Sequence, residues 1–230
     1  MKIWAILPAA GIGRRMGSST PKQYHSLCGT PVLLHSINRL LGNPDIEHLV
    51  VVLHPQDEYW VNLDYSNARV STVEGGEERF NSVLNGLNSL ADRASPDDWI
   101  LVHDAVRPCV QNEDIARLIE SLQGDDVGGL LGAPIDSTVK RVNDESAVLS
   151  TVDRGDLWFA LTPQMFRFDL LHKALCHAIA ENLAVTDEAS AVEALGLQPK
   201  VIPGHKSNIK ITHESDLQYA EYFLTAGDSE

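Results

Sequence analysis

The sequence lacks the features that identify membrane, secreted and zinc-binding proteins. It has no stretch of about 18 uninterrupted apolar residues, as a membrane span would require, and no basic and then apolar leader with a cleavage site. Its three cysteines, Cys28, Cys109 and Cys176, are widely spaced and form no Cys-x-x-Cys pair, so neither a disulfide framework nor a zinc site is indicated. We expect a soluble cytoplasmic protein that does not bind a membrane.

Basic residues are also scarce. The chain has 18 Lys and Arg against 32 Asp and Glu, a net charge of −14. Binding to the phosphate backbone of a nucleic acid needs an extended basic surface, and this composition argues against such a partner. A site for a smaller polyanion must be a local concentration of cations, so basic residues that lie beside glycines are informative in this chain.

The remaining composition is that of an ordinary globular protein. With 230 residues, 43% of them hydrophobic and 22% charged, the chain can form one sizeable α/β domain over residues 1–230. Short apolar runs predict strands at residues 3–7, 48–53, 69–73, 99–102, 127–133, 201–203 and 208–211. Helical spacing of apolar residues predicts helices at 32–41, 80–91, 114–122, 170–179, 186–195 and 214–224. This alternation indicates a mostly parallel sheet covered by helices on both faces, with ligands at the carboxyl ends of the strands.

The most informative segment is the loop from Pro8 to Gln23, which directly follows the first predicted strand. Its glycines let the backbone approach phosphate oxygens closely, and they are Gly11, Gly13 and Gly17. The same loop carries three cations, namely Arg14, Arg15 and Lys22. This combination predicts a cradle for a polyphosphate.

Two better-known glycine loops do not fit this segment. In the dinucleotide fingerprint the third glycine comes one residue earlier, and Thr20-Pro21 blocks immediate continuation into a helix. The P-loop ends in Gly-Lys-Ser/Thr, whereas Gly17-Ser18-Ser19 has no lysine. The loop therefore belongs to another class of phosphate-binding segment.

A second group of polar side chains is predicted to face the same cleft. In the helix that begins near Glu77, Arg79 and Ser82 lie off the apolar stripe, so they can look into a cleft. The predicted strand at 99–102 ends in the polar segment from His103 to Pro108. We expect both groups to lie near the glycine loop.

Residues 134–155 form an insertion of a different kind. Two β-branched segments, 138–142 and 148–152, flank a polar turn at 143–146 and predict a β-hairpin. A lone two-stranded hairpin is marginally stable in water, so it must pack against something. A second copy of the chain is the simplest candidate, and folding back onto its own domain is the alternative.

Several motifs in fixed order carry a resemblance to a known family. They are the glycine loop with Pro21-Lys22-Gln23, Gly75 to Arg79 with Ser82-Val83, His103 to Pro108, Thr151 to Arg154, Thr162-Pro163-Gln164, Thr186 to Ala189, and Asn208-Ile209-Lys210. Together they resemble the 2-C-methyl-D-erythritol 4-phosphate cytidylyltransferase family from Ile3 to about Leu224. The resemblance implies a Rossmann-like nucleotidyltransferase sheet with a projecting hairpin as a dimerisation arm.

The resemblance also implies roles for individual residues. The expected catalytic cations are Arg15, Lys22 and Lys210. The expected CTP-binding residues are Pro8, Ala9, Ala10, Gly11, Gly13, Gly76, Glu77, Ser82, Asp104 and Ala105. The expected residues for the sugar-phosphate substrate are Asp104, Arg107, Thr138, Arg154, Thr162 and Lys210, of which Thr138 and Arg154 reach across a homodimer to the partner's substrate.

The chemistry of such a reaction suits this residue set. A phosphate monoester is largely dianionic at neutral pH and can attack the α-phosphorus of CTP without a general base. The difficulty is electrostatic, because two anions must approach, and cations on the protein together with Mg²⁺ bound with CTP would relieve it. Asp104 could bind Mg²⁺, orient substrate hydroxyls or pair with Arg107, and we expect the second role.

Two positions depart from the family pattern. Ser137 stands where the family often has an aspartate before the threonine that matches Thr138, and Val106 stands where alanine or glycine is usual. The first departure affects how Thr138 is oriented. The second adds bulk beside Arg107 without removing a functional group.

Three other functions remain open at the level of sequence. A cytidylyltransferase for another polyol phosphate, such as ribitol 5-phosphate, would share the glycine loop and the His-Asp-Ala motif. A sugar or molybdenum-cofactor nucleotidyltransferase would not be expected to have the arm or the segment from Gly75 to Ser82. A non-catalytic nucleotide-binding regulator would not need Lys22, Lys210 and the arm together.

Overall fold

The computed structural model describes residues 1–11 and 20–226 of the chain. Its central sheet has seven strands in the order β11-β7-β10-β6-β1-β4-β5. These strands are β1 (Ile3–Pro8), β4 (Ile46–Leu53), β5 (Val70–Glu74), β6 (Trp99–Val102), β7 (Gly128–Pro134), β10 (Trp158–Arg167) and β11 (Lys200–Pro203). Two small sheets pair β2 (Ser26–Leu27) with β3 (Thr30–Pro31) and β8 (Val139–Val142) with β9 (Val148–Val152).

Helices lie against both faces of the central sheet. They are α1 (Val32–Leu41), α2 (Arg79–Ser89), α3 (Asn112–Leu122), α4 (Phe168–Ala180), α5 (Glu188–Glu193) and α6 (Ser215–Ala226), with short 3-10 turns η2 (Lys22–Tyr24) and η3 (Trp60–Asn62). Alternate side chains of β1 point to opposite faces, as a strand dictates. Ala5 and Leu7 pack with α1 and α3, while Trp4 and Ile6 pack with α2, α4 and α5. The predicted α/β architecture is confirmed.

The strand directions agree with a mostly parallel sheet. β1 is parallel to β4 and β6, β4 is parallel to β5, and β11 is parallel to β7. The exception is β10, which runs antiparallel to both β6 and β7. No strand is predicted there from the sequence, because Pro163 in its middle lacks a backbone donor. In the structure the pairing register shifts at this point, between Ala160 and Gln164.

One predicted strand is wrong. Residues 208–211 form no strand, although their apolar and polar residues alternate. The alternation has another cause, since Ile211 is buried in a cluster with α6 and its N–H donates to the carbonyl of Val106. Asn208 instead bonds to the carbonyl of Thr162. The segment is an irregular connection that crosses the end of the sheet.

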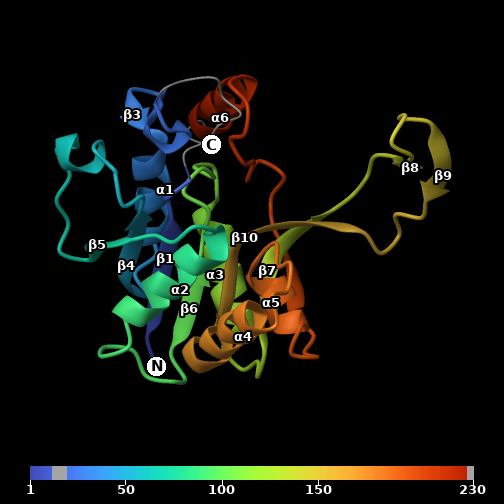
Figure 1. The fold of residues 1–230 in the computed structure, drawn as a ribbon. Helices are drawn as coiled ribbons and strands as arrows, with labels where there is room; N and C mark the ends of the chain where they lie inside the picture. The colour runs from blue at the N-terminus through green and yellow to red at the C-terminus, as the bar shows by residue number, and fades with distance from the viewer. Residues whose placement is uncertain (12–19, 227–230) are drawn as a thin grey trace.

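The predicted hairpin is confirmed, and it projects as an arm. The chain leaves the sheet after β7, forms β8 and β9, and returns to the sheet at β10, so that β8 and β9 stand away from the sheet and its helices (Figure 1). The hairpin therefore does not fold back onto its own domain. Large apolar side chains on the arm and at its base are exposed, namely Val142, Val148, Leu149, Trp158 and Phe159. Such a surface is typical of one that packs against another protein.

A glycine on β7 gives a test of the edge pairing. A Cβ at Gly129 would collide with the backbone carbonyl of Lys200 in the neighbouring edge strand β11, with which it pairs. We expect Gly129→Ala to lower the free energy of unfolding by about 1–3 kcal/mol, measured by urea denaturation. Gly124→Ala is the matched control, because a Cβ there meets nothing within 4 Å, and it should change stability by less than about 0.5 kcal/mol. Equal stability of the two variants would contradict this account of the sheet edge.

Candidate active site

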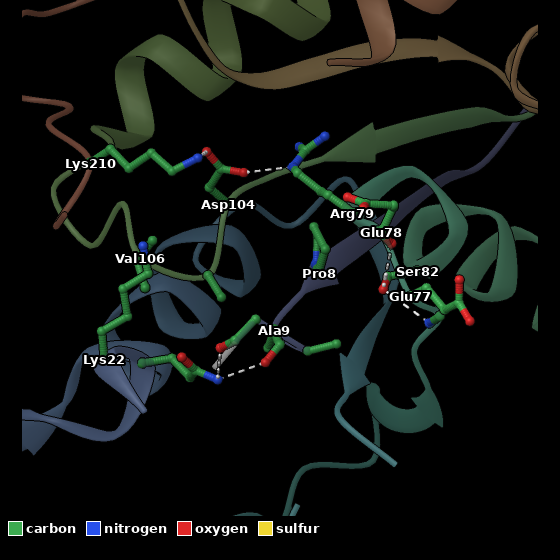
Figure 2. Close-up of a pocket in the computed structure, with 15 residues that line it drawn as sticks. Pro8, Ala9, Lys22, Glu77, Glu78, Arg79, Ser82, Asp104, Val106 and Lys210 are labelled. Carbon is green, nitrogen blue, oxygen red and sulfur yellow. Dashed lines mark hydrogen bonds and ion pairs between the residues drawn. The ribbon is translucent and has the colours of Figure 1, made fainter. Parts of the chain in front are cut away.

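A pocket lies where the carboxyl ends of β1 and β6 meet the start of α2 (Figure 2). The predicted residues that line it are Pro8, Ala9, Ala10, Gly11, Lys22, Gly76, Glu77, Ser82, Asp104, Ala105 and Lys210. Gly13 and Arg15 lie outside the described residues. The structure therefore brings together the glycine loop, the helix face and the His-Asp-Ala segment, which are far apart along the chain.

The predicted residues for the second substrate lie in three places. Lys210 and Asp104 line the pocket, and Arg107 lies directly beside Asp104 with its side chain 11% exposed. Thr162 is buried under the site. Thr138 and Arg154 line a separate hollow on the arm.

Gln23, at the end of the glycine loop, is hydrogen-bonded to the start of the same loop. Its side-chain amide donates to the carbonyl of Ala9 at 2.7 Å and to that of Gly11 at 3.1 Å. The neighbouring Lys22 lies in the short η2 turn, and its Nζ donates to the carbonyl of Ile211 at 3.2 Å. Because Gln23 is buried, the turn is held in place and Lys22 is kept on the pocket wall.

The turn before α2 packs tightly against the glycine loop. A Cβ at Gly75 would lie 2.6 Å from the Cβ of Ala10 and 2.8 Å from the Oγ of Ser82, so only glycine fits. Ser82 Oγ accepts from the N–H of Gly76 at 3.1 Å and donates to the carbonyl of Glu78 at 3.2 Å. Ser82 thus shapes the turn, and its predicted contact with CTP stays a prediction.

The carboxylate of Asp104 is surrounded by three cations. Oδ1 accepts from Nε of Arg79 at 3.1 Å, and Oδ2 contacts Nζ of Lys210 at 2.9 Å (Figure 2). Oδ2 also contacts Nε of Arg107 at 3.3 Å. Burial alone would raise the pKa of Asp104, but the three cations overcome it and hold that pKa far below its ordinary value. Asp104 is therefore a buried anion in the folded protein.

Asp104 does not fit the role of a metal ligand. Its oxygens contact the three cations Arg79, Lys210 and Arg107, and these positive charges would repel a metal ion bound at the same carboxylate. Across residues 1–11 and 20–226, no group of three or more His, Cys, Asp or Glu side chains is placed to hold a metal ion. The implied Mg²⁺ has no protein ligand that we can assign among these residues.

The partner of Arg79 could not be predicted from the sequence. Arg79 lines the pocket as the pattern of α2 predicts, but its guanidinium also binds Glu188, 109 residues away, at 2.6 Å and 3.1 Å. Glu188 is 1% exposed. The signal for it was the segment Thr186 to Ala189, which the resemblance includes and to which no role was given.

His103 and Thr162 support the loop that carries Asp104. Thr162 Oγ1 accepts from the backbone N–H of Asp104 at 3.1 Å and lies 2.9 Å from Nδ1 of His103. Nε2 of His103 lies 3.0 Å from the carbonyl of Arg107. Burial lowers the pKa of His103 to about 4, so the ring is neutral, with Nε2–H donating to Arg107 and Nδ1 accepting from Thr162.

Asn208 joins the irregular C-terminal segment to the same loop. Its side chain donates to the carbonyl of Thr162 at 2.7 Å, and its own carbonyl accepts from Arg107 at 2.7 Å. Lys210 follows two residues later, so these bonds bring it to Asp104. Thr162 and Asn208 act beneath the pocket, as supports of the residues that line it.

This fold and site define an α/β nucleotidyltransferase: a glycine loop at the end of β1, a tight turn before α2 and cations around a buried carboxylate. The sequence model of the 2-C-methyl-D-erythritol 4-phosphate cytidylyltransferase (IspD) family matches residues 3–226. The chain belongs to this family. It is a transferase of isoprenoid precursor synthesis.

Individual relatives agree with this assignment. The chain is 50% identical to the 2-C-methyl-D-erythritol 4-phosphate cytidylyltransferase of Hahella chejuensis over 224 residues, which are 97% of this chain and 93% of that protein. It is 46% identical to the enzyme of that name from Yersinia pseudotuberculosis over 230 residues, covering 99% and 94%.

Solved structures of the same name have the same fold. The crystal structure from Francisella tularensis matches with a TM-score of 0.85 at 39% identity, covering 97% of this chain and 100% of that one. The structure from Thermus thermophilus matches with a TM-score of 0.81 at 28% identity, covering 98% of this chain and 100% of that one.

Among the helices of residues 1–11 and 20–226, none has the length and apolar character that a membrane span requires.

The buried, neutral His103 gives the protein a predictable sensitivity to acid. Its folded pKa of about 4 lies below its ordinary value of 6.5, so the unfolded chain binds this proton more readily. The stabilisation is complete above the unfolded pKa and is lost as the pH falls toward 4. We expect a loss of about 2 kcal/mol from this residue between about pH 7 and about pH 5. Urea unfolding at both pH values measures this loss. If the free energy of unfolding of His103→Gln fell as much between the two pH values as that of the wild type, the assignment would be contradicted.

Proposed function

We propose that the protein transfers a cytidylyl group from CTP to 2-C-methyl-D-erythritol 4-phosphate. The observation that carries the proposal is the pocket in which Lys22 and Lys210 face the glycine loop, in a chain of this family. A phosphate oxygen of the substrate attacks the α-phosphorus of CTP and forms a new P–O–P bond. The bond between the α-phosphorus and the bridging oxygen breaks, and pyrophosphate leaves with the electron pair.

The protein contributes position and positive charge. The dianionic substrate phosphate needs no general base. We assign Lys22, Lys210 and Arg15 to the charge that develops around the α-phosphate, where one well-placed donor contributes about 10²-fold or more in rate. Mg²⁺ would enter with CTP and be held by its phosphates, since this ion keeps several waters and favours substrate oxygens.

The remaining residues bind the two substrates. CTP would lie along the backbone of 8–13, against Gly76, Glu77 and Ser82, with Asp104 and Ala105 near its ribose. Asp104 and Arg107 would orient the polyol phosphate, with Thr162 supporting them. The ionised, acceptor-only carboxylate of Asp104 suits a hydroxyl donor.

We propose further that the active enzyme is a homodimer. Thr138 and Arg154 lie on a projecting arm whose large apolar side chains are exposed, and a second chain would cover them. Each arm would then bring its Arg154 to the phosphate of the substrate in the partner's site. Each chain would be one catalytic domain with an arm insertion at about 134–155. The enzyme would work in the cytoplasm, with CTP as a substrate.

An assay of pyrophosphate release tests the reaction. With CTP we expect turnover of 2-C-methyl-D-erythritol 4-phosphate to exceed that of ribitol 5-phosphate or erythritol 4-phosphate by at least about 10²-fold, a difference that polar contacts to hydroxyls can supply. Preference for ribitol 5-phosphate would transfer the proposal to that substrate, and no release with any of them would overturn it.

The same assay tests the role of Lys22. The Lys22→Ala variant should fold normally and turn over at least about 10²-fold more slowly than the wild type, because it loses a charge aimed at the α-phosphate.

The dimer is tested by mixing two impaired variants at a polyol phosphate concentration well below the raised KM. Arg154→Ala should raise KM for the polyol phosphate strongly and leave KM for CTP nearly unchanged, because one substrate loses a ground-state contact. In a heterodimer with a Lys22→Ala chain, one site then carries both lesions and the other carries neither. Activity should partly return on mixing.

Arg141→Ala is the matched control for the arm. Arg141 is an exposed arginine of β8 that does not line the hollow of Arg154. We expect this variant to keep its KM for both substrates. Absence of recovery on mixing, with subunit exchange verified by labelled chains, would contradict the shared site.

A further inference from the structure

Glu188 is a buried carboxylate to which the reaction gives no role. It is 1% exposed, lies outside the pocket lining and therefore cannot touch a substrate. Its Oε1 accepts from Nη1 of Arg79 at 2.6 Å and its Oε2 accepts from Nη2 at 3.1 Å. This two-pronged geometry is the strongest and most directional form of an arginine–carboxylate pair.

Glu188 is fixed from the other side by the sheet. It is the first residue of α5, which Asp187 caps by accepting from the N–H of Ser190 at 2.9 Å. Gln164 of β10 donates to Oδ2 of Asp187 at 2.9 Å and accepts from the N–H of Ala189 at 2.8 Å. The start of α5, and with it Glu188, is therefore tied to the strand next to β6.

Arg79 carries this constraint to the active site. With both terminal nitrogens on Glu188, only its Nε reaches Oδ1 of Asp104, at 3.1 Å. Oδ2 of Asp104 is then left to Lys210 and Arg107. A guanidinium released from Glu188 could turn and take both oxygens of Asp104, and Lys210 would lose its partner.

We propose that Glu188 is a positioning residue, which acts on the reaction through Arg79 by fixing the carboxylate of Asp104 and the place of Lys210. The inference rests on the proposed function. Its effect falls on turnover rather than on binding, because Lys210 is assigned to the charge that develops in the transition state.

The test is a double-mutant cycle on kcat. Glu188→Gln keeps the size of the side chain and removes its charge, and we expect kcat to fall about tenfold while both KM values change less than about threefold. Arg79→Gln should lower kcat about 10²-fold. If Glu188 acts through Arg79, the double variant should also lose about 10²-fold, not the 10³-fold or so of two independent effects.

Asp98→Asn is the matched control. Asp98 is another buried carboxylate, but it lies at the opposite end of the sheet and accepts from the backbone of Lys2 and Ser95 and from Nε1 of Trp4. Its loss should lower the melting temperature and leave kcat within about twofold of the wild type, because no part of the pocket touches it.

Three results would overturn the inference. One is a Glu188→Gln enzyme that is less stable but has normal kcat, since the pair would then serve folding alone. Another is additive losses in the double variant. The third applies if Glu188→Gln does not fold, in which case Glu188→Asp is measured in its place. The shorter aspartate cannot keep both hydrogen bonds to Arg79, so a normal kcat in that variant would count against the inference. A wild type without turnover would instead refute the proposed function.

Discussion

Asp104 is 6% exposed, and three cations converge on its carboxylate, two of them from segments far from it along the chain. Arg79 comes from the start of α2, Arg107 from the loop after β6, and Lys210 from the irregular segment before α6. The carboxylate of Asp104 could not stay at this place alone, because a buried charge without a partner is strongly destabilising. The active-site wall is therefore assembled as one electrostatic unit. Ion pairs within the protein hold these four side chains in position.

The negative net charge of the chain explains why the cations of the site are grouped closely. At −14, the protein as a whole repels CTP and a sugar phosphate, so the site must hold its cations close together. Cations at such short range would repel one another, and Asp104 and Glu188 reduce that repulsion. Both carboxylates are held in the wall by hydrogen bonds. In the proposed reaction, the developing negative charge would then meet donors that are already in position, which is the condition for electrostatic stabilisation of a transition state.

Several of the motifs shared with the family do not line the pocket, and the structure gives them a physical task. Gln164 fixes the start of α5, while Thr162 and Asn208 tie β10 and the C-terminal segment to the loop of Asp104. The neutral His103 completes this support from within. These side chains satisfy backbone groups at the end of the sheet, where no further strand can do so. The precision of the site depends on them as much as on the residues that would touch substrate.

Local patterns were enough to predict the strand before the glycine loop, the helix face of Arg79 and Ser82, the hairpin and most of the residues that line the pocket. Periodicity, glycines and turn residues act over a few positions, so they can be identified along the chain. Three features could be seen only in the folded chain: β10 runs antiparallel between β6 and β7, residues 208–211 cross the sheet end without forming a strand, and Glu188 holds Arg79. These contacts join residues roughly 25 to 110 positions apart. They depend on the order of strands in the sheet, which no local pattern encodes.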